Sequence, residues 1–326
     1  MSQKKIGNET RVNRWGYFFV LPFVIVYFLF NLYPTLYTLM LAFTNSKGFS
    51  GLSGNYIFVG LKNFSKLVQD QYFWGALSNT FIMWGWNFAP QLGIALILSI
   101  WLSDIRLKLK GQGFFRAVIY MPNLLTAASV ALLYRSLFGY PIGPVNQFLQ
   151  SLDIYDIVER DGKLIQEAFN FFRSVPMSRG IVAFIQWWMW YGHTVIMLMA
   201  GITSISSSLY ESAVVDGANS RQTTWYITLP MLRPMMLYIL VTNMIGGMQM
   251  LEIPFLLTGM RGEPDFKIRT TNVYIYNMAF QGVNDYAYAA AISIGMFIVT
   301  MILALTIFFF LQDRSELKKR VKGETK

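Results

Sequence analysis

Two apolar stretches of this chain, 181–205 and 235–258, contain polar side chains of a kind that can do chemistry. These side chains are Tyr191, His193, Asn243, Gln249 and Glu252. Amide, carboxylate and imidazole groups hydrogen-bond to hydroxyls, and aromatic rings stack on the C–H groups of sugars. Polar residues within apolar spans are costly and tend to face a cavity or another helix. The five residues are therefore candidates for the lining of a solute pathway.

Two of these candidates also have a purely structural interpretation. His193 lies halfway along its stretch, where packing between helices is a common role for histidine. Glu252 is close to the end of its stretch, so an ion pair between helices or extension of the side chain to the membrane surface competes with solute binding. Arg135, near the end of the stretch 114–138, is expected to extend to the surface in the same way.

Several reaction types are excluded by composition. The chain has no cysteine and a single histidine, so it lacks the residues for disulfides, thiolate metal sites or a Ser–His triad. No Gly-x-x-x-x-Gly-Lys-Ser/Thr phosphate loop is present, and Gly162-Lys163 lacks the upstream glycine. ATP-driven work would therefore depend on a partner.

The second chemical feature is a polar segment, 206–234, between the two apolar stretches. Its first part, Ser206–Val215, has the pattern of a short amphipathic helix with Glu211 near the first turn. Ser207 or Ser208 is the expected N-cap, because a serine hydroxyl can accept from the free N–H groups of a helix start.

A turn and a second short helix are expected after this first helix. Asp216 and Gly217 predict the turn, because glycine adopts left-handed backbone angles at low cost. Pro230 and Pro234 are expected to end the second helix. Two short helices joined at a glycine suit docking into a groove of a partner. We call 206–234 the elbow segment.

Composition places these features in a membrane protein. Of 326 residues, 54% are hydrophobic and only 13% charged, and the mean hydropathy is +0.41. Soluble proteins carry about 25% charged residues, so a water-exposed surface of normal polarity cannot be built from this chain.

Six stretches are long enough to cross a bilayer, which needs about 20 apolar residues. They are 15–43, 77–103, 114–138, 181–205, 235–258 and 287–311. The first is too long for the apolar part of a cleaved signal peptide. The sequence therefore predicts an all-α integral membrane protein with six transmembrane helices in a single domain, 1–326.

The basic residues indicate the orientation. The segments on one predicted side carry nine of the ten excess positive charges, and they are 1–14, 104–116, 206–234 and 313–326. Basic segments face the cytoplasm, so both termini and the elbow segment are expected inside. The net charge of +10 then reflects topology, which argues against nucleic-acid binding.

The largest feature on the opposite side is the loop 139–180. It begins with turn residues, and a short helix is expected within its charged half, Asp153–Arg173. Its acidic residues are Asp153, Asp156, Glu159 and Asp161, and their spacing favours a hydrated surface. In the last span Ala287, Ala291 and Gly295 predict close helix packing.

The elbow segment resembles the "EAA" signature of binding-protein-dependent ABC importer permeases. The matching positions are Glu211, Ala213, Asp216, Gly217, Ala218, Ile227, Leu229, Pro230 and Pro234. Ser212 stands where the signature has a second alanine, and Thr224 where an aromatic residue is usual. The chain is most similar to the carbohydrate-uptake (maltose-type) permeases, and its first span resembles that of the first of their two permeases.

The resemblance extends over nearly the whole chain. Further matching residues are Leu21, Pro22, Tyr33, Pro34, Phe58–Phe64, Phe115, Arg116, Met121, Pro122, Leu257–Gly259, Tyr276–Phe280, Tyr286 and Ala287. One departure follows Thr258, where the family often has a Gly-Gly-Gly-Pro run and this chain has Gly259–Pro264.

The resemblance implies a type I importer fold and a subunit that is not itself an enzyme. The ATPase-coupling residues would be Glu211, Ser212, Ala213, Asp216, Gly217 and Ala218. The implied partners are a second homologous permease, two cytoplasmic ABC ATPase subunits that bind ATP and Mg, and an extracytoplasmic solute-binding protein. The chain would hold no cofactor or metal and would lie among lipids of a bacterial or archaeal cytoplasmic membrane. It would move a sugar or oligosaccharide by alternating access, through a pocket on spans four to six.

Three alternatives differ in substrate or mechanism. A polyol or glycerol phosphate could use the same machinery. A stand-alone secondary transporter would need coupling carboxylates within the membrane, and only Glu252 is available. A membrane-embedded enzyme would need paired acids or several histidines, which only the acidic residues of the loop 139–180 approach.

Overall fold

The computed structural model describes most of the chain, except for its ends and a few short internal segments. The described residues are 14–48, 56–103, 110–160, 162–259, 261–282 and 284–311. The basic ends 1–13 and 312–326, part of the basic segment 104–116, and Asp161 therefore lie outside the described residues.

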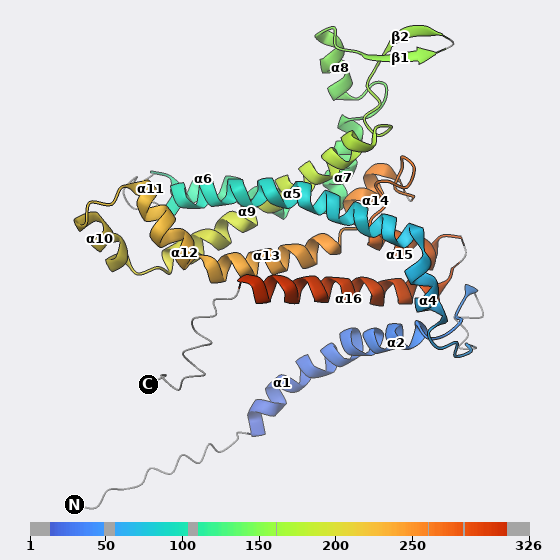
Figure 1. Ribbon diagram of the computed structural model, residues 1–326, viewed down its shortest axis with the longest axis horizontal. Helices are drawn as coiled ribbons and strands as arrows, with labels where there is room; N and C mark the ends of the chain where they lie inside the picture. Colours follow the sequence, from blue (N-terminus) through green and yellow to red (C-terminus); the bar gives the residue numbers. More distant parts are fainter. Residues whose placement is uncertain are drawn as a thin grey trace, which may run out of the picture.

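Long helices form a bundle with their axes roughly aligned (Figure 1). The main ones are α5 (Gln71–Ser103), α9 (Val175–Thr203), α13 (Arg233–Met248) and α16 (Tyr286–Leu311). Within the described residues, five helical stretches are long and apolar enough to span a membrane, and a sixth counts if a sharply bent pair crosses as one span.

The first span stands apart from the bundle (Figure 1). It comprises α1 (Arg14–Tyr27), a π-helical turn η1 (Phe28–Leu32) and α2 (Tyr33–Leu41). Its most apolar 18-residue window is entirely unburied, although α2 contacts α16. A surface of this kind requires lipid or another protein around it.

The third predicted span is not one continuous helix. α6 (Gln112–Tyr120) and a 3₁₀ turn, η2 (Met121–Leu124), are followed by α7 (Ala127–Leu137) at a bend of 85°. Leu125 is extended, and Thr126 caps α7 by accepting from the Ser129 N–H. Apolar composition does not reveal such a break, and the predicted span 114–138 is a single span only if the two bent helices cross together.

The fifth span is also interrupted, between α13 and α14 (Glu252–Thr258). The break falls at Gln249–Leu251, between Gly247 near the end of α13 and Pro254 in α14. Gly247 has a packing role: a Cβ there would lie 2.1 Å from Cδ1 of Trp84 on α5. Pro254 lies in the first turn of α14, where a missing N–H is tolerated.

Small residues bring α16 close to its neighbours, as predicted. Ala287 and Ala291 are fully buried. A Cβ on Gly295 would lie 2.5 Å from Leu67 Cδ2 of α4 (Lys62–Gln69). Leu67 and Phe73 then form a buried cluster with Tyr288 and others of α15 (Thr271–Phe280) and α16.

The loop 139–180 forms an arm that projects from the bundle (Figure 1). It contains α8 (Pro144–Ser151) and a hairpin of β1 (Asp156–Arg160) and β2 (Lys163–Glu167), paired antiparallel with Val158 opposite Ile165. The helix expected within Asp153–Arg173 is therefore replaced by strands. β-branched residues at Ile157, Val158 and Ile165 favour strands, and Gly162 has the positive φ of a turn.

Candidate functional site

The elbow segment begins with α10 (Ser207–Val215). Its N-cap is Ser206, one residue before the expected serines, and no side chain caps the helix. The Ser206 hydroxyl instead lies 2.8 Å from that of Ser208. The predicted N-cap was therefore off by one residue, because serines next to each other are interchangeable in a sequence pattern.

The turn predicted at Gly217 is present, and local hydrogen bonds fix it. Gly217 has a φ of +78°, its N–H donates to Val214, and the Ala218 N–H donates to Ala213 at 2.8 Å. These two bonds form a Schellman motif, which ends a helix at a left-handed residue. No atom lies within 4 Å of a Cβ placed on Gly217, so the need for glycine there arises from the backbone angle alone.

A second cap restarts the helix two residues after the turn. Asn219 and Gln222 exchange hydrogen bonds of 2.8 and 2.9 Å in a capping box at the start of α11 (Ser220–Thr223). Tyr210 of α10 reaches across the turn to Thr228, with 3.2 Å between the hydroxyls. The elbow therefore has a defined shape that its own residues determine.

The second helix continues through the proline that was expected to end it. α11 runs into a π-helical turn, η3 (Thr224–Thr228), and then α12 (Leu229–Met231), which contains Pro230. Proline clashes with the carbonyl four residues earlier, here that of Tyr226, and the wider π turn displaces this group. The first span has the same arrangement, with η1 before Pro34.

The predicted coupling residues lie together on the elbow. Glu211, Ser212, Asp216 and Gly217 are exposed, Ala213 is buried and Ala218 is half-buried. Exposed apolar side chains flank them, with Val215 at 86%, Trp225 at 63% and Tyr226 at 79% exposure. Exposed apolar groups beside an exposed carboxylate are typical of a protein-binding surface. The elbow lies at the opposite end of the bundle from α4 and α15 (Figure 1).

The predicted pathway residues are separated from one another rather than gathered in one pocket. Asn243 faces the interior, where its Oδ1 accepts from Gln91 Nε2 of α5 at 3.1 Å. The same nitrogen lies 2.7 Å from the Thr194 hydroxyl of α9. Gln91 and Thr194 are each only 1% exposed, so this polar contact joins three helices inside the bundle.

Gln249 lies at a separate cavity of about 500 Å³ between α13, α15 and α16. Its backbone carbonyl accepts from Asn272 Nδ2 at 2.8 Å. The remaining lining includes Ser293 and Thr300 of α16, among apolar side chains such as Phe297. Amides and hydroxyls on an apolar wall are suited to a small polar solute.

The other three candidates do not touch this cavity. Glu252 is exposed at the first position of α14, where a carboxylate complements the helix dipole. Tyr191 is half-buried, with its ring 5.8 Å from that of Trp187. His193 is exposed and meets the edge of Trp190 at 6.2 Å. Arg135, expected to extend to the surface, donates to the Leu256 carbonyl of α14 at 3.0 Å.

Sequence reasoning missed five polar residues at these sites, and they are Gln91, Thr194, Asn272, Ser293 and Thr300. Gln91 had a visible signal, because it is one of three amide side chains, with Asn79 and Asn87, in the apolar run 77–103. The serine and threonine residues gave no such signal in the sequence. These residues are common in spanning helices, where their hydroxyls donate hydrogen bonds to backbone carbonyls of the same helix. Within the described residues, no group of three or more metal-ligating side chains occurs.

Long apolar helices with a buried polar contact between them, and a structured elbow at one end, define a multi-span membrane protein. Residues 95–321 match the family of binding-protein-dependent transport system inner membrane components. This match covers more than half of the chain, so the chain belongs to that family.

Curated relatives extend the similarity to nearly the full length. The lactose transport system permease LacF of Rhizobium radiobacter is 28% identical over 92% of this chain and 94% of its own. The multiple sugar-binding transport system permease MsmF of Streptococcus mutans is 28% identical over 94% of this chain and 96% of its own length.

A solved structure shares the fold. It is a crystal structure of a bacterial alginate ABC transporter in complex with an alginate pentasaccharide-bound periplasmic protein. The TM-score is 0.73 at 22% identity, over 94% of this chain and 96% of that one.

Proposed function

We propose that this chain is a transmembrane subunit of an ATP-driven importer that takes up a sugar or oligosaccharide. The observation that carries the proposal is the family match over 95–321, which includes both the elbow segment and the helices with the polar cavity. Relatives named for lactose and for multiple sugars support the substrate class. The chain acts as a transport subunit, and the energy comes from partner ATPases that bind ATP and Mg.

The coupling surface in this proposal is the exposed face of α10 and its turn. Glu211 and Ser212 contact the ATPase subunit, while Asp216, Gly217 and Ala218 hold the turn that transmits its movement. Ala213 packs beneath them. Support comes from the position of this face at one end of the bundle and from its exposed apolar side chains. Closure of the ATPase pair would then reorient the helices that continue from the elbow, α9 and α13.

The proposed assembly also contains a second homologous permease and an extracytoplasmic solute-binding protein. The unburied first span offers an apolar surface to lipid or to that second permease. Six spans with both termini inside the cell agree with the excess of basic residues on the elbow side. The membrane is then the cytoplasmic membrane of a bacterium or archaeon.

The proposed substrate pathway passes the cavity at Gln249. Gln249, Asn272, Ser293 and Thr300 supply hydrogen bonds to hydroxyls, and no Lys or Arg lines this cavity. A neutral sugar fits this lining better than a phosphate. Asn243, Tyr191, His193 and Glu252 are proposed as further contacts along the route.

Reconstitution tests the proposal directly. The complete transporter, with both permeases, the ATPases and the binding protein, is placed in liposomes with labelled lactose, trehalose or arabino-oligosaccharides, sugars for which relatives are named. Uptake of at least one of these sugars should require ATP and the binding protein. Glu211→Lys, which puts a cation in the proposed ATPase cleft, should reduce uptake at least tenfold at an unchanged amount of protein. Uptake by the purified chain alone without ATP would contradict the proposal and favour a stand-alone transporter.

A further inference from the structure

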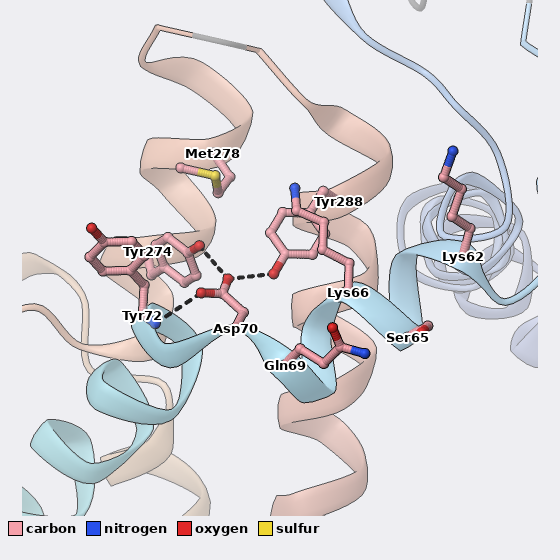
Figure 2. Close-up of a pocket in the computed structure, with 9 residues that line it drawn as sticks. All are labelled: Lys62, Ser65, Lys66, Gln69, Asp70, Tyr72, Tyr274, Met278 and Tyr288. Atoms are coloured by element: carbon pink, nitrogen blue, oxygen red, sulfur yellow. Dashed lines mark hydrogen bonds between the residues drawn. The ribbon is translucent and has the colours of Figure 1, made fainter.

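A second cavity, of about 700 Å³, opens at the α4 end of the bundle, far from the elbow (Figures 1 and 2). It is lined by α4, the start of α5, α15 and α16. The lining residues used below are Lys62, Lys66, Asp70, Tyr72, Tyr274 and Tyr288. None of them belongs to the elbow or to the proposed substrate pathway.

Asp70 lies at the centre of this cavity, but its charge is already satisfied (Figure 2). Its carboxylate accepts from the Tyr274 hydroxyl at 2.6 Å, from the Tyr288 hydroxyl, and from the Tyr72 backbone N–H at 2.9 Å. Burial raises the pKa of Asp70, yet these hydrogen bonds outweigh it and the pKa is lowered overall. Asp70 therefore stays ionised and acts as a fixed anchor for three helices.

The cations around Asp70 outnumber it. Lys66 lies with its ammonium 3.6 Å from the centre of the Tyr288 ring. Lys62 lines the cavity one turn earlier on α4. Arg269 is 7% exposed and lies behind the Tyr72 and Tyr274 rings, at 5.2 and 4.6 Å from their centres. Within the described residues Arg269 forms no ion pair, and its buried Nε has no hydrogen-bond partner.

This arrangement selects an anion rather than a neutral sugar. A sugar would stack on exposed ring faces, but Lys66 covers a face of Tyr288, and Arg269 covers faces of Tyr72 and Tyr274. Three cations against one satisfied carboxylate leave a positive potential in the cavity. The ammonium groups of Lys62 and Lys66 are exposed and can move onto a bound phosphate.

The position of the cavity identifies the source of that phosphate. α4 connects the first two spans and so lies where the bundle meets the membrane surface. Leu61, just before α4, and Val68 on α4 are each 68% exposed, and Tyr72 and Trp74 are exposed just after it. Exposed aliphatic and aromatic residues beside lysines are typical of the interface between lipid headgroups and acyl chains.

We propose that this cavity binds the phosphate headgroup of an anionic phospholipid from the membrane leaflet opposite the elbow. Lys62 and Lys66 contact the phosphate, Arg269 supplies additional positive potential, and Leu61 and Val68 lie along the acyl chains. The lipid would then tie α4 to α15 and α16 at the surface where these elements meet.

Native mass spectrometry of the purified full-length chain tests this site. The protein is titrated with phosphatidylglycerol or phosphatidylcholine that have the same acyl chains. Wild type should retain phosphatidylglycerol in clear preference. Lys62→Gln with Lys66→Gln should weaken its binding roughly 10- to 30-fold, since each lysine near an anionic lipid contributes on the order of 1 kcal/mol. Lys163→Gln with Arg173→Gln removes the same charge from exposed positions on the arm, away from the cavity, and should leave binding unchanged.

Two results would overturn the proposal. One is a lack of lipid discrimination, seen either as equal retention of the two lipids by wild type or as an equal loss of phosphatidylglycerol binding in both double variants. The other is stabilisation of the lipid-free protein by glycerol 3-phosphate as large as that by phosphatidylglycerol, which would identify a soluble anion as the ligand. Size-exclusion profiles that match wild type establish that the variants are folded.

Discussion

At the scale of single residues, the shape of the elbow depends on one backbone angle. Gly217 adopts a φ of +78°, and its neighbours Ala213 and Ala218 are joined by the bond that closes the motif. Asp-Gly in a polar segment predicted this turn because the signal is local. The contact of Gln91 with Asn243 could not be predicted in this way, since it joins residues 152 positions apart.

Substitutions at Gly217 separate backbone angle from side-chain size. Asparagine tolerates the left-handed region, whereas a β-branched residue is strained there by at least 1–2 kcal/mol, on the order of a tenfold change in an equilibrium. Gly217→Asn should keep most of the ATP-driven uptake, and Gly217→Val should lower the uptake rate roughly tenfold or more. Uptake by the reconstituted transporter is the measurement. Equal activity of the two variants would show that the angle is unimportant.

At the scale of elements, apolar length predicted where helices run but not where they break. The bend before α7 and the interruption after α13 both lie inside apolar stretches. Hydropathy averages over about one span and is blind to a single extended residue such as Leu125. The strands of the arm were not predicted. The charged residues of Asp153–Arg173 suggested a helix, and the β-branched residues among them are few.

Two adjacent glycines on α13 test the packing of this element against α5. A Cβ on Gly247 would overlap Trp84, which is stacked on Phe88, whereas a Cβ on Gly246 would meet no atom within 4 Å. Gly247→Ala should therefore lower the free energy of unfolding by about 1–3 kcal/mol. Gly246→Ala should be neutral or stabilising by up to about 1 kcal/mol. Thermal unfolding in detergent compares them, and equal midpoints would refute the close contact.

At the scale of the whole molecule, the chain separates its roles along the bundle. The elbow lies at one end of the bundle, and the arm projects from elsewhere on it (Figure 1). The cavity at Gln249 is lined by α13, α15 and α16, and the lysine-lined cavity lies beside α4. Charge counting predicts that the elbow side faces the cytoplasm, and this prediction needs no knowledge of the fold because the positive-inside rule depends only on sequence. The packed structure was needed to show which polar groups face one another.

Cross-linking measures the proposed contact between α10 and the ATPase. The chain has no cysteine, so Glu211→Cys introduces a single thiol on the exposed face of α10. In the assembled transporter, a short thiol-to-amine cross-linker should join position 211 to the ATPase subunit. Lys163→Cys, on the hairpin of the arm, should give no such product. A cross-link to the ATPase from position 163, or none from position 211 in an intact complex, would contradict the account.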